Sequence, residues 1–171
     1  MAPSTPALSR PLPSGTRAPS FQLSAAPDTS VSLADCAGSP VVLVFYPADF
    51  SPVCGDELAL FNELLPELQR HGARVFGVSV DSVWSHLAFA KERKLRFPLL
   101  ADFHPKGEMS RRYHAWRESE GVCERALYVV DGDGVIAWSH VSPPAVNPGV
   151  DGVLAALEDL SAQAASREVR P

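Results

Sequence analysis

The stretch VVLVFYPADFSPVC, residues 41–54, decides the fold of this chain. Its first six residues are apolar and rich in β-branched and aromatic side chains, which is typical of a strand that is buried on both faces. A short loop follows, and Ser51-Pro52 is a strong helix start, with serine as the N-cap and proline at the first helical position. The stretch therefore predicts a central strand, a loop and a helix that carries Cys54 in its first turn.

In the rest of the chain, segments whose apolar residues have the spacing of a strand alternate with segments that have the spacing of a helix. Further strands are expected at residues 21–23, 31–33, 75–80, 98–101, 125–130 and 135–138, the last two joined as a hairpin by the turn at 131–134. Helices are expected at 51–72 with a kink at Pro66, at 82–94, at 107–113 and from Asn147 onward. This order predicts an α/β fold with a central mixed sheet and helices on both faces.

A single domain accounts for most of the 171 residues. We expect the domain to span residues 18–165, with a disordered N-terminal tail at 1–17 and a short C-terminal tail at 166–171. The N-terminal segment is basic and rich in serine, which also suggests a transit peptide. Its prolines oppose an amphipathic helix, so a disordered tail is the preferred interpretation.

Composition excludes several classes of function. The net charge is -5 and no basic run is present, which argues against nucleic-acid binding. No span approaches the roughly 18 consecutive apolar residues of a membrane helix, so no membrane partner is expected. The three cysteines are widely spaced and odd in number, which indicates a reducing, cytoplasmic location. The five histidines lack metal-ligand spacing, so we expect no metal and no other cofactor.

Cys54 is the residue with the clearest chemistry. The unpaired N–H groups of the first helical turn and the helix dipole favour the thiolate. Asp56 and Glu57, which are expected in the same turn, oppose it. A nearby cation is therefore required, and Arg125 at the start of an apolar strand is the long-range candidate. The alternative for Arg125 is an ordinary surface arginine at the end of a strand.

The loop and its flanks resemble the peroxiredoxins of the AhpC/TSA family. The peroxidatic loop of that family has a proline, three residues, threonine or serine, two residues and cysteine, and Pro47, Ser51 and Cys54 match this spacing. The family's arginine precedes an apolar strand and an Asp-Gly turn, as Arg125 does here. Residues 97–105 and the sparse cysteines make the chain most similar to the one-cysteine, E-type alkyl hydroperoxide reductases.

The resemblance implies a thioredoxin-like fold and a thiol-dependent peroxidase that reduces hydrogen peroxide and alkyl hydroperoxides. Cys54 would attack a peroxide oxygen and become a sulfenic acid. The Ser51 hydroxyl would bind the peroxide, Arg125 would steady the thiolate and the departing oxygen, and Pro47 would shield the sulfur. Glu57 would orient the arginine. Threonine is commoner than serine at the position of Ser51, so activity is expected to be retained but slower.

The partners follow from the same resemblance. An external thiol would regenerate Cys54, either a thioredoxin-like protein, a glutaredoxin-like protein or a low-molecular-weight thiol, and a homodimer is expected. The position five residues beyond Cys54, where one subgroup has its resolving cysteine, is Ala59. Cys36 and Cys123 are interpreted as small buried hydrophobic residues, with a resolving role for either as the alternative. We expect Cys123 to share a strand face with Arg125.

The sequence leaves two other functions as alternatives. A dithiol oxidoreductase needs a second thiol, and the SPVC motif has serine at that place. A redox sensor or holdase with slow turnover on the same fold is the second alternative, and the rate of peroxide consumption distinguishes it from a peroxidase.

Overall fold

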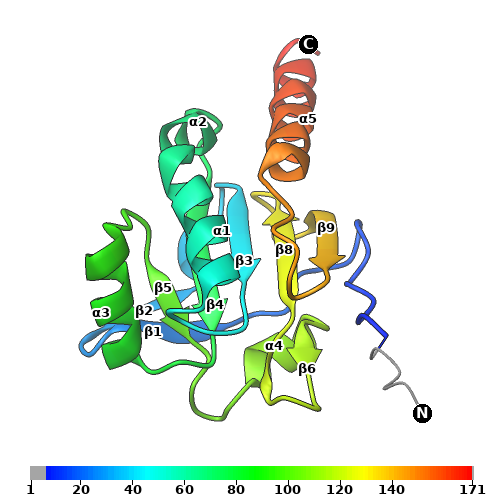
Figure 1. Ribbon diagram of the computed structural model, residues 1–171. Helices are drawn as coiled ribbons and strands as arrows, with labels where there is room; N and C mark the ends of the chain where they lie inside the picture. The colour runs from blue at the N-terminus through cyan, green and yellow to red at the C-terminus, as the bar shows by residue number, and fades with distance from the viewer. Residues whose placement is uncertain (1–6, 171) are drawn as a thin grey trace.

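A computed structural model describes residues 7–170 as a seven-stranded mixed sheet with helices packed against it (Figure 1). The strand order is β2-β1-β5-β4-β3-β8-β9. The strands of this sheet are β1 (Gln22–Ala26), β2 (Thr29–Ser32), β3 (Val41–Phe45), β4 (Arg74–Ser79), β5 (Leu99–Ala101), β8 (Arg125–Val130) and β9 (Ile136–Ser142). The helices are η1 (Ala34–Cys36), α1 (Pro52–Glu63), α2 (Leu65–Arg70), α3 (Val83–Arg93), α4 (Glu108–Arg112) and α5 (Asp151–Glu168).

β3 lies in the interior of the sheet, as its apolar sequence predicted. All five of its residues are buried. It pairs in parallel with β4 on one side and antiparallel with β8 on the other. The mixed character of the sheet is therefore confirmed at its centre. The parallel pairing also places the start of α1, which follows β3, at the carboxyl edge of the two parallel strands.

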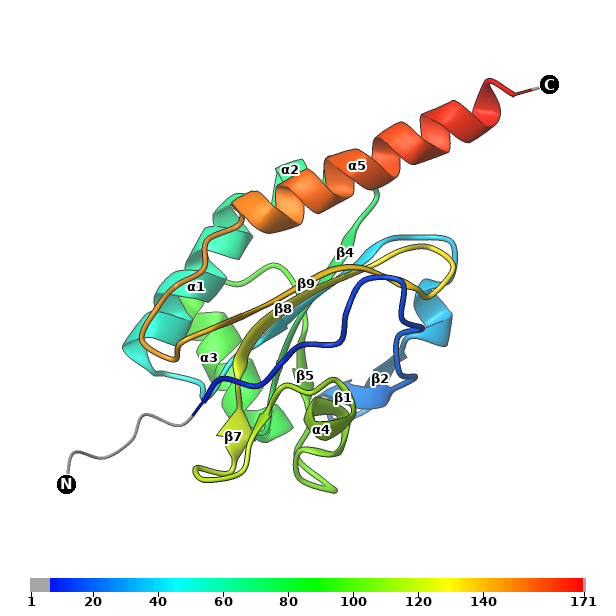
Figure 2. The same cartoon turned by 90° about the vertical axis from the view of Figure 1, so that its right-hand side faces the viewer.

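The two faces of the sheet are covered unequally. In Figure 2, α1, α2, α3 and α5 lie on one side of the sheet, and α4 lies on the other side. The first face buries a core that includes Cys54, Leu58, Phe89 and Leu157. The second face buries a separate core under η1, α4 and the segment that precedes β1. Helices on both faces were predicted, and the second face is the more thinly covered one.

The first long helix is broken rather than kinked. α1 ends at Glu63, and α2 begins at Leu65 with Pro66 in its first turn. Proline is tolerated there because the first N–H groups of a helix have no intrahelical partner. The position of the irregularity was predicted correctly from Pro66. A kink in one helix was expected, and the structure has two separate helices.

Residues 9–17 were predicted to be disordered, and the structure differs. The Leu12 N–H donates to the Tyr128 hydroxyl at 2.9 Å, and Leu12 O accepts from the Ser139 hydroxyl at 2.6 Å. Gly15 and Thr16 exchange backbone hydrogen bonds with Ile136. This segment therefore satisfies its polar groups along β8 and β9. The first six residues of the predicted tail lie outside the described residues.

The C-terminal boundary also differs from the prediction. α5 continues to Glu168, three residues beyond the expected end of the domain at 165. Figure 2 shows its C-terminal half extending away from the sheet, where residues 161–170 are exposed.

A two-stranded ribbon, β6 (Trp116–Arg117) with β7 (Val122–Cys123), was not predicted. Each strand has two residues, which is too short for a periodic signal. Within residues 7–170 the structure has no helix long and apolar enough to span a membrane.

Candidate active site

The loop between β3 and α1 leads directly to Cys54. Ser51 is the N-cap of α1 and Pro52 its first residue, so Cys54 is in the first turn as predicted. The Cys54 side chain is fully buried. Asp56 and Glu57 were expected in the first turn as well, and that expectation is wrong, because the first turn contains no acidic residue. Asp56 is exposed and Glu57 is completely buried.

Arg125 and Cys54 meet in the core. The Arg125 guanidinium is 1 % exposed, and its Nη2 donates to Cys54 Sγ at 3.3 Å. Its Nε donates to the Pro144 carbonyl at 2.9 Å, and its Nη1 donates to Glu57 Oε2 at 2.5 Å. Each guanidinium nitrogen thus has a partner, which fixes the orientation of the group. A buried cation in contact with the sulfur favours the thiolate and can stabilise negative charge on a nearby oxygen.

Glu57 is the acidic partner of this cation. Burial raises the pKa of Glu57 to about 7, although the adjacent Arg125 lowers it. Its second oxygen, Oε1, is buried without a hydrogen-bond partner. One buried guanidinium therefore faces two groups that can carry negative charge, Glu57 and Cys54, and the two compete for the same cation.

Ser51 and Pro47 complete the loop around the sulfur. Both residues are half-buried. Ser51 has the extended backbone of an N-cap, but its side chain makes no capping hydrogen bond. The hydroxyl is therefore not committed to the helix and can donate to a bound molecule. The structure thus unites Cys54, Arg125 and Glu57 by direct contacts and places Ser51 and Pro47 in the adjoining loop.

The comparisons with known proteins agree with this geometry. The model of the AhpC/TSA family matches residues 14–139. The chain belongs to the AhpC/TSA family. It is 38% identical over 150 residues to peroxiredoxin-2 of Bos taurus, which covers 82% of this chain and 74% of the bovine one. It is 34% identical over 168 residues to the chloroplastic 2-Cys peroxiredoxin BAS1 of Hordeum vulgare, covering 92% of this chain and 79% of the barley protein.

Among solved structures, the reduced 2-Cys peroxiredoxin of Plasmodium vivax is similar with a TM-score of 0.82 and 26% identity, over 91% of this chain and 85% of that one. The fold is therefore thioredoxin-like, and this peroxiredoxin is a thiol peroxidase, an oxidoreductase that acts on peroxide. Peroxiredoxins use thioredoxin-like reductants and often form dimers.

The other two cysteines of this peroxiredoxin are buried in the opposite core. Burial raises the pKa of Cys123 to about 12, and its Sγ lies 3.0 Å from the Ser110 hydroxyl. Burial also raises the pKa of Cys36, whose Sγ contacts the Ser32 carbonyl at 3.5 Å. Cys123 does not share a face with Arg125, and that expectation is wrong. Glu124 separates β7 from β8 and interrupts the strand alternation on which the expectation was based.

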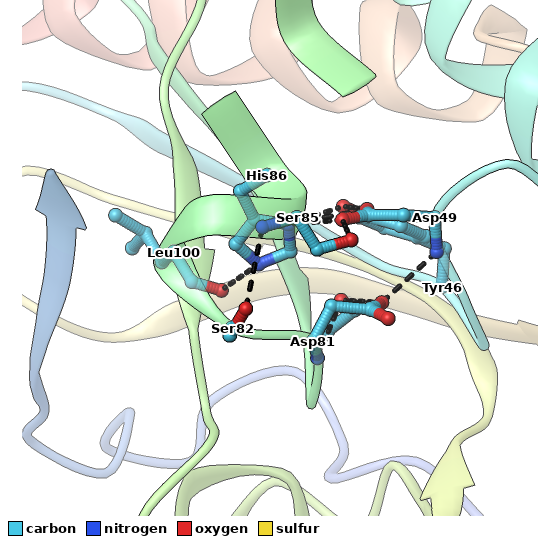
Figure 3. A network of polar contacts seen from close by, with 8 residues as sticks. Tyr46, Asp49, Asp81, Ser82, Ser85, His86 and Leu100 are labelled. Carbon is cyan, nitrogen blue, oxygen red and sulfur yellow. Dashed lines mark hydrogen bonds and ion pairs between the residues drawn. The ribbon is translucent and has the colours of Figure 1, made fainter. Parts of the chain in front are cut away.

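A polar network beside the peroxidatic loop was missed at the level of sequence (Figure 3). Asp49 lies in the loop and accepts hydrogen bonds from Tyr46, Ser85 and His86, and we call these four residues the Asp49 network. The His86 side chain is buried and pairs with Asp49. The available signal was a histidine on the buried face of α3, three residues before Phe89.

Two members of this network, together with the neighbouring Asp81, offer atoms of the kind that bind metals. Ligand atoms of Asp49, Asp81 and His86 all lie within 4.8 Å of one another. These atoms are already engaged within the protein. Asp81 Oδ2 accepts from the Ser79 hydroxyl at 2.6 Å and from the Asp49 N–H at 2.9 Å, and His86 uses both ring nitrogens. The hydrogen bonds account for the cluster without an ion.

Gly55, which follows Cys54, makes room for a second guanidinium. A Cβ atom at this position would lie 2.5 Å from Arg93 Nη2 and 2.8 Å from Arg93 Cζ. The glycine therefore allows the Arg93 side chain of α3 to lie directly against the backbone of α1.

Proposed function

We propose that this peroxiredoxin reduces hydrogen peroxide and alkyl hydroperoxides by a one-cysteine mechanism with Cys54 as the peroxidatic residue. The observation that carries the proposal is the contact of 3.3 Å between Arg125 Nη2 and Cys54 Sγ inside the core. A desolvated thiolate held by a guanidinium is both nucleophilic and positioned. Ser51, Pro47 and Glu57 have supporting roles.

The first step forms a sulfur–oxygen bond and breaks the oxygen–oxygen bond of the peroxide. The Cys54 thiolate supplies the electron pair to one oxygen, and the other oxygen leaves with the bonding pair. Arg125 and the Ser51 hydroxyl are the donors that stabilise the leaving oxygen as its negative charge grows. That oxygen takes up a proton to give water or an alcohol, and Cys54 is left as a sulfenic acid. Pro47 restricts the access of water and of bulky thiols to the sulfur.

The second step is reduction by an external thiol. Cys36 and Cys123 are buried in the core on the opposite face of the sheet from Cys54. A thiol with a pKa of about 12, such as Cys123, has almost no thiolate at neutral pH and is a poor resolving group. A thiolate from a thioredoxin-like protein, a glutaredoxin-like protein or a small thiol attacks the sulfenic sulfur and releases water. A second thiol then frees Cys54. Free buried thiols fit a reducing, cytoplasmic compartment.

A homodimer is part of the proposal. Large apolar side chains are exposed near the peroxidatic loop, where Phe50 is 50% and Trp84 71% exposed. Association of two copies would bury such side chains. Light scattering over a range of protein concentrations measures the mass directly, and a monomer at every concentration would exclude the dimer.

The test of the mechanism is intact-mass spectrometry after one equivalent of peroxide, combined with stopped-flow rates. We expect wild-type protein to gain one oxygen at Cys54, and a Cys36→Ser/Cys123→Ser double variant to keep the wild-type rate. Cys54→Ser is the inactive control. A loss of two hydrogens that maps to a Cys54–Cys123 or Cys54–Cys36 disulfide would overturn the one-cysteine mechanism. A slow rate that Arg125→Ala does not change would instead favour the redox sensor or holdase.

A further inference from the structure

Asp49 receives an unusual number of hydrogen bonds for a loop residue. Its Oδ1 accepts from the Tyr46 hydroxyl at 2.6 Å. Its Oδ2 accepts from the Ser85 hydroxyl at 2.8 Å and from His86 Nδ1 at 2.8 Å. Its side chain and that of His86 are each 1% exposed. Three donors from two different elements therefore converge on one buried carboxylate.

His86 uses both ring nitrogens within the protein. Its Nε2 lies 3.2 Å from the Leu100 carbonyl, which can only accept, so Nε2 bears a hydrogen. Its Nδ1 lies 2.8 Å from Asp49 Oδ2 and 3.3 Å from the Tyr46 hydroxyl, so it contacts two residues that follow β3. Burial, together with Asp49, raises the pKa of Tyr46 well above its ordinary value, which keeps the tyrosine a donor. His86 therefore joins Asp49 to the Leu100 carbonyl through its two ring nitrogens, and Asp81 lies beside this buried pair.

The network ties the peroxidatic loop to the sheet and to α3. Tyr46 and Asp49 follow β3, and Ser85 and His86 belong to α3. The Asp49 N–H also donates to Asp81, just after β4 (Figure 3). Cys54 is five positions beyond Asp49 on the same continuous segment. The position of the first turn of α1 is therefore coupled to the place where Asp49 is held.

Two features of the loop show why it needs this attachment. Phe50, next to Asp49, has a φ of 63°, a left-handed conformation that is unfavourable for an aromatic residue. It persists only where neighbouring contacts impose it, and its ring packs against Phe89 with 5.1 Å between centroids. Ser51, the next residue, makes no side-chain cap to α1. The loop thus lacks the local bond that usually fixes a helix start.

We propose that the hydrogen-bonded His86–Asp49 pair positions the peroxidatic loop so that Cys54 stays in contact with Arg125. His86 is a positioning residue, because it acts through the loop. The inference rests on the proposed peroxidase function of Cys54. Loss of the His86 side chain removes one of the three hydrogen-bond partners of the buried Asp49 carboxylate, which favours a displaced loop. Reaction with peroxide, which needs Arg125, then slows. Alkylation by iodoacetamide needs only an accessible thiolate and does not slow in parallel.

The test compares these two reactions in the full-length protein. We measure the second-order rate of Cys54 oxidation by hydrogen peroxide and of Cys54 alkylation by iodoacetamide, and take their ratio. His86→Leu is expected to lower the ratio by about 10- to 100-fold, the range for a reacting group misplaced by an ångström. Ser85→Ala removes one donor and is expected to lower it about threefold. A ratio within twofold of wild type in folded His86→Leu overturns the proposal.

Matched controls separate positioning from stability. His71→Leu removes the histidine that follows α2 and contacts Ser161, far from the loop in sequence, and its ratio should equal that of wild type. Leu157→Ala destabilises the core beneath α5 and removes no hydrogen bond of the network, so its ratio should also be unchanged. If His86→Leu does not fold, Ser85→Ala decides, and an unchanged ratio in that variant overturns the proposal.

Amide hydrogen exchange distinguishes failure of this inference from failure of the proposed function. If wild-type protein does not consume peroxide, the peroxidase proposal fails. Amide exchange still tests whether the network holds the loop in place, because it does not depend on catalysis. We expect faster exchange at residues 47–55 in Ser85→Ala and in His86→Leu than in wild type, and wild-type exchange there in His71→Leu. Unchanged exchange in both network variants contradicts the positioning role.

Discussion

Arg125 Nη2 lies 3.3 Å from Cys54 Sγ although 71 positions separate the two residues. The register of the sheet explains the contact. β3 and β8 are antiparallel, and Phe45 at the end of β3 is opposite Ala126 near the start of β8. The first residue of β8 is therefore delivered to the loop and helix that follow β3. The pairing of β3 with β8 thus brings the Arg125 guanidinium to Cys54. The residues close to Cys54 in the sequence supply no such cation.

Replacing Arg125 tests this contact. Arg125→Lys keeps a positive charge but cannot donate to Cys54, Glu57 and Pro144 at once, because an ammonium lacks the planar fork of a guanidinium. We expect the rate with hydrogen peroxide to fall by about 10²- to 10³-fold, the usual cost of removing one donor from a developing anion. Competition kinetics measure the rate. Arg70→Lys, on the exposed face of α2, should have no effect, and a rate for Arg125→Lys within threefold of wild type would refute the assigned role.

Ser51 gives a second prediction. Its hydroxyl makes no cap to α1, so removing it should cost little stability and should act on the bound peroxide instead. Ser51→Ala is expected to slow peroxide reduction about tenfold, the value of one hydrogen bond of moderate strength. Ser51→Thr keeps the hydroxyl and restrains its rotamer, so it should be as fast as wild type or faster. Equal rates for Ser51→Ala and wild type would show that the hydroxyl has no role.

The sequence predicts the parts of the site that depend on local pattern. The run 41–46 and the Ser51-Pro52 start are enough to place a central strand, a helix and Cys54. The Asp49–His86 pair could not be predicted in this way, because its members are 37 positions apart and each alone is compatible with ordinary packing. The same limit applies to residues 9–17. Their prolines suggested disorder, and it is long-range hydrogen bonding to β8 and β9 that orders them.

Glu57 predicts a dependence of stability on pH. Its ordinary pKa of 4.5 applies in the unfolded chain, and burial raises it to about 7 in the folded protein. Between these values the folded state binds more protons than the unfolded one, so the contribution of Glu57 is full below about pH 4.5 and is lost as the pH rises to about 7. Glu57→Gln cannot ionise and should flatten the free energy of unfolding over this window. Urea denaturation at several pH values measures it.

A matched surface variant provides the comparison for Glu57. Glu67→Gln alters an exposed carboxylate paired with Arg70 and should retain the wild-type pH profile. If the free energy of unfolding of Glu57→Gln changes with pH as steeply as that of wild type between pH 5 and about 7, the protonation of Glu57 does not cause the pH dependence in this range.

Alanine substitutions at Gly55 and Gly77 should have different effects on stability, because the neighbour of Gly55 is a flexible side chain and the neighbours of Gly77 are packed in the core. At Gly55 an added Cβ would meet only the far end of Arg93, an exposed side chain that can swing away. Alanine also favours the helix by about 1 kcal/mol, so Gly55→Ala should leave the free energy of unfolding unchanged or raise it by up to that amount.

At Gly77 in β4 the Cβ would lie 2.6 Å from Leu99 Cδ2 and 3.2 Å from the Tyr46 ring, both in the packed core. Gly77→Ala should therefore destabilise by about 1–3 kcal/mol. Urea unfolding of both variants measures the difference, and a Gly55→Ala loss as large as that of Gly77→Ala would mean that Arg93 is held in place.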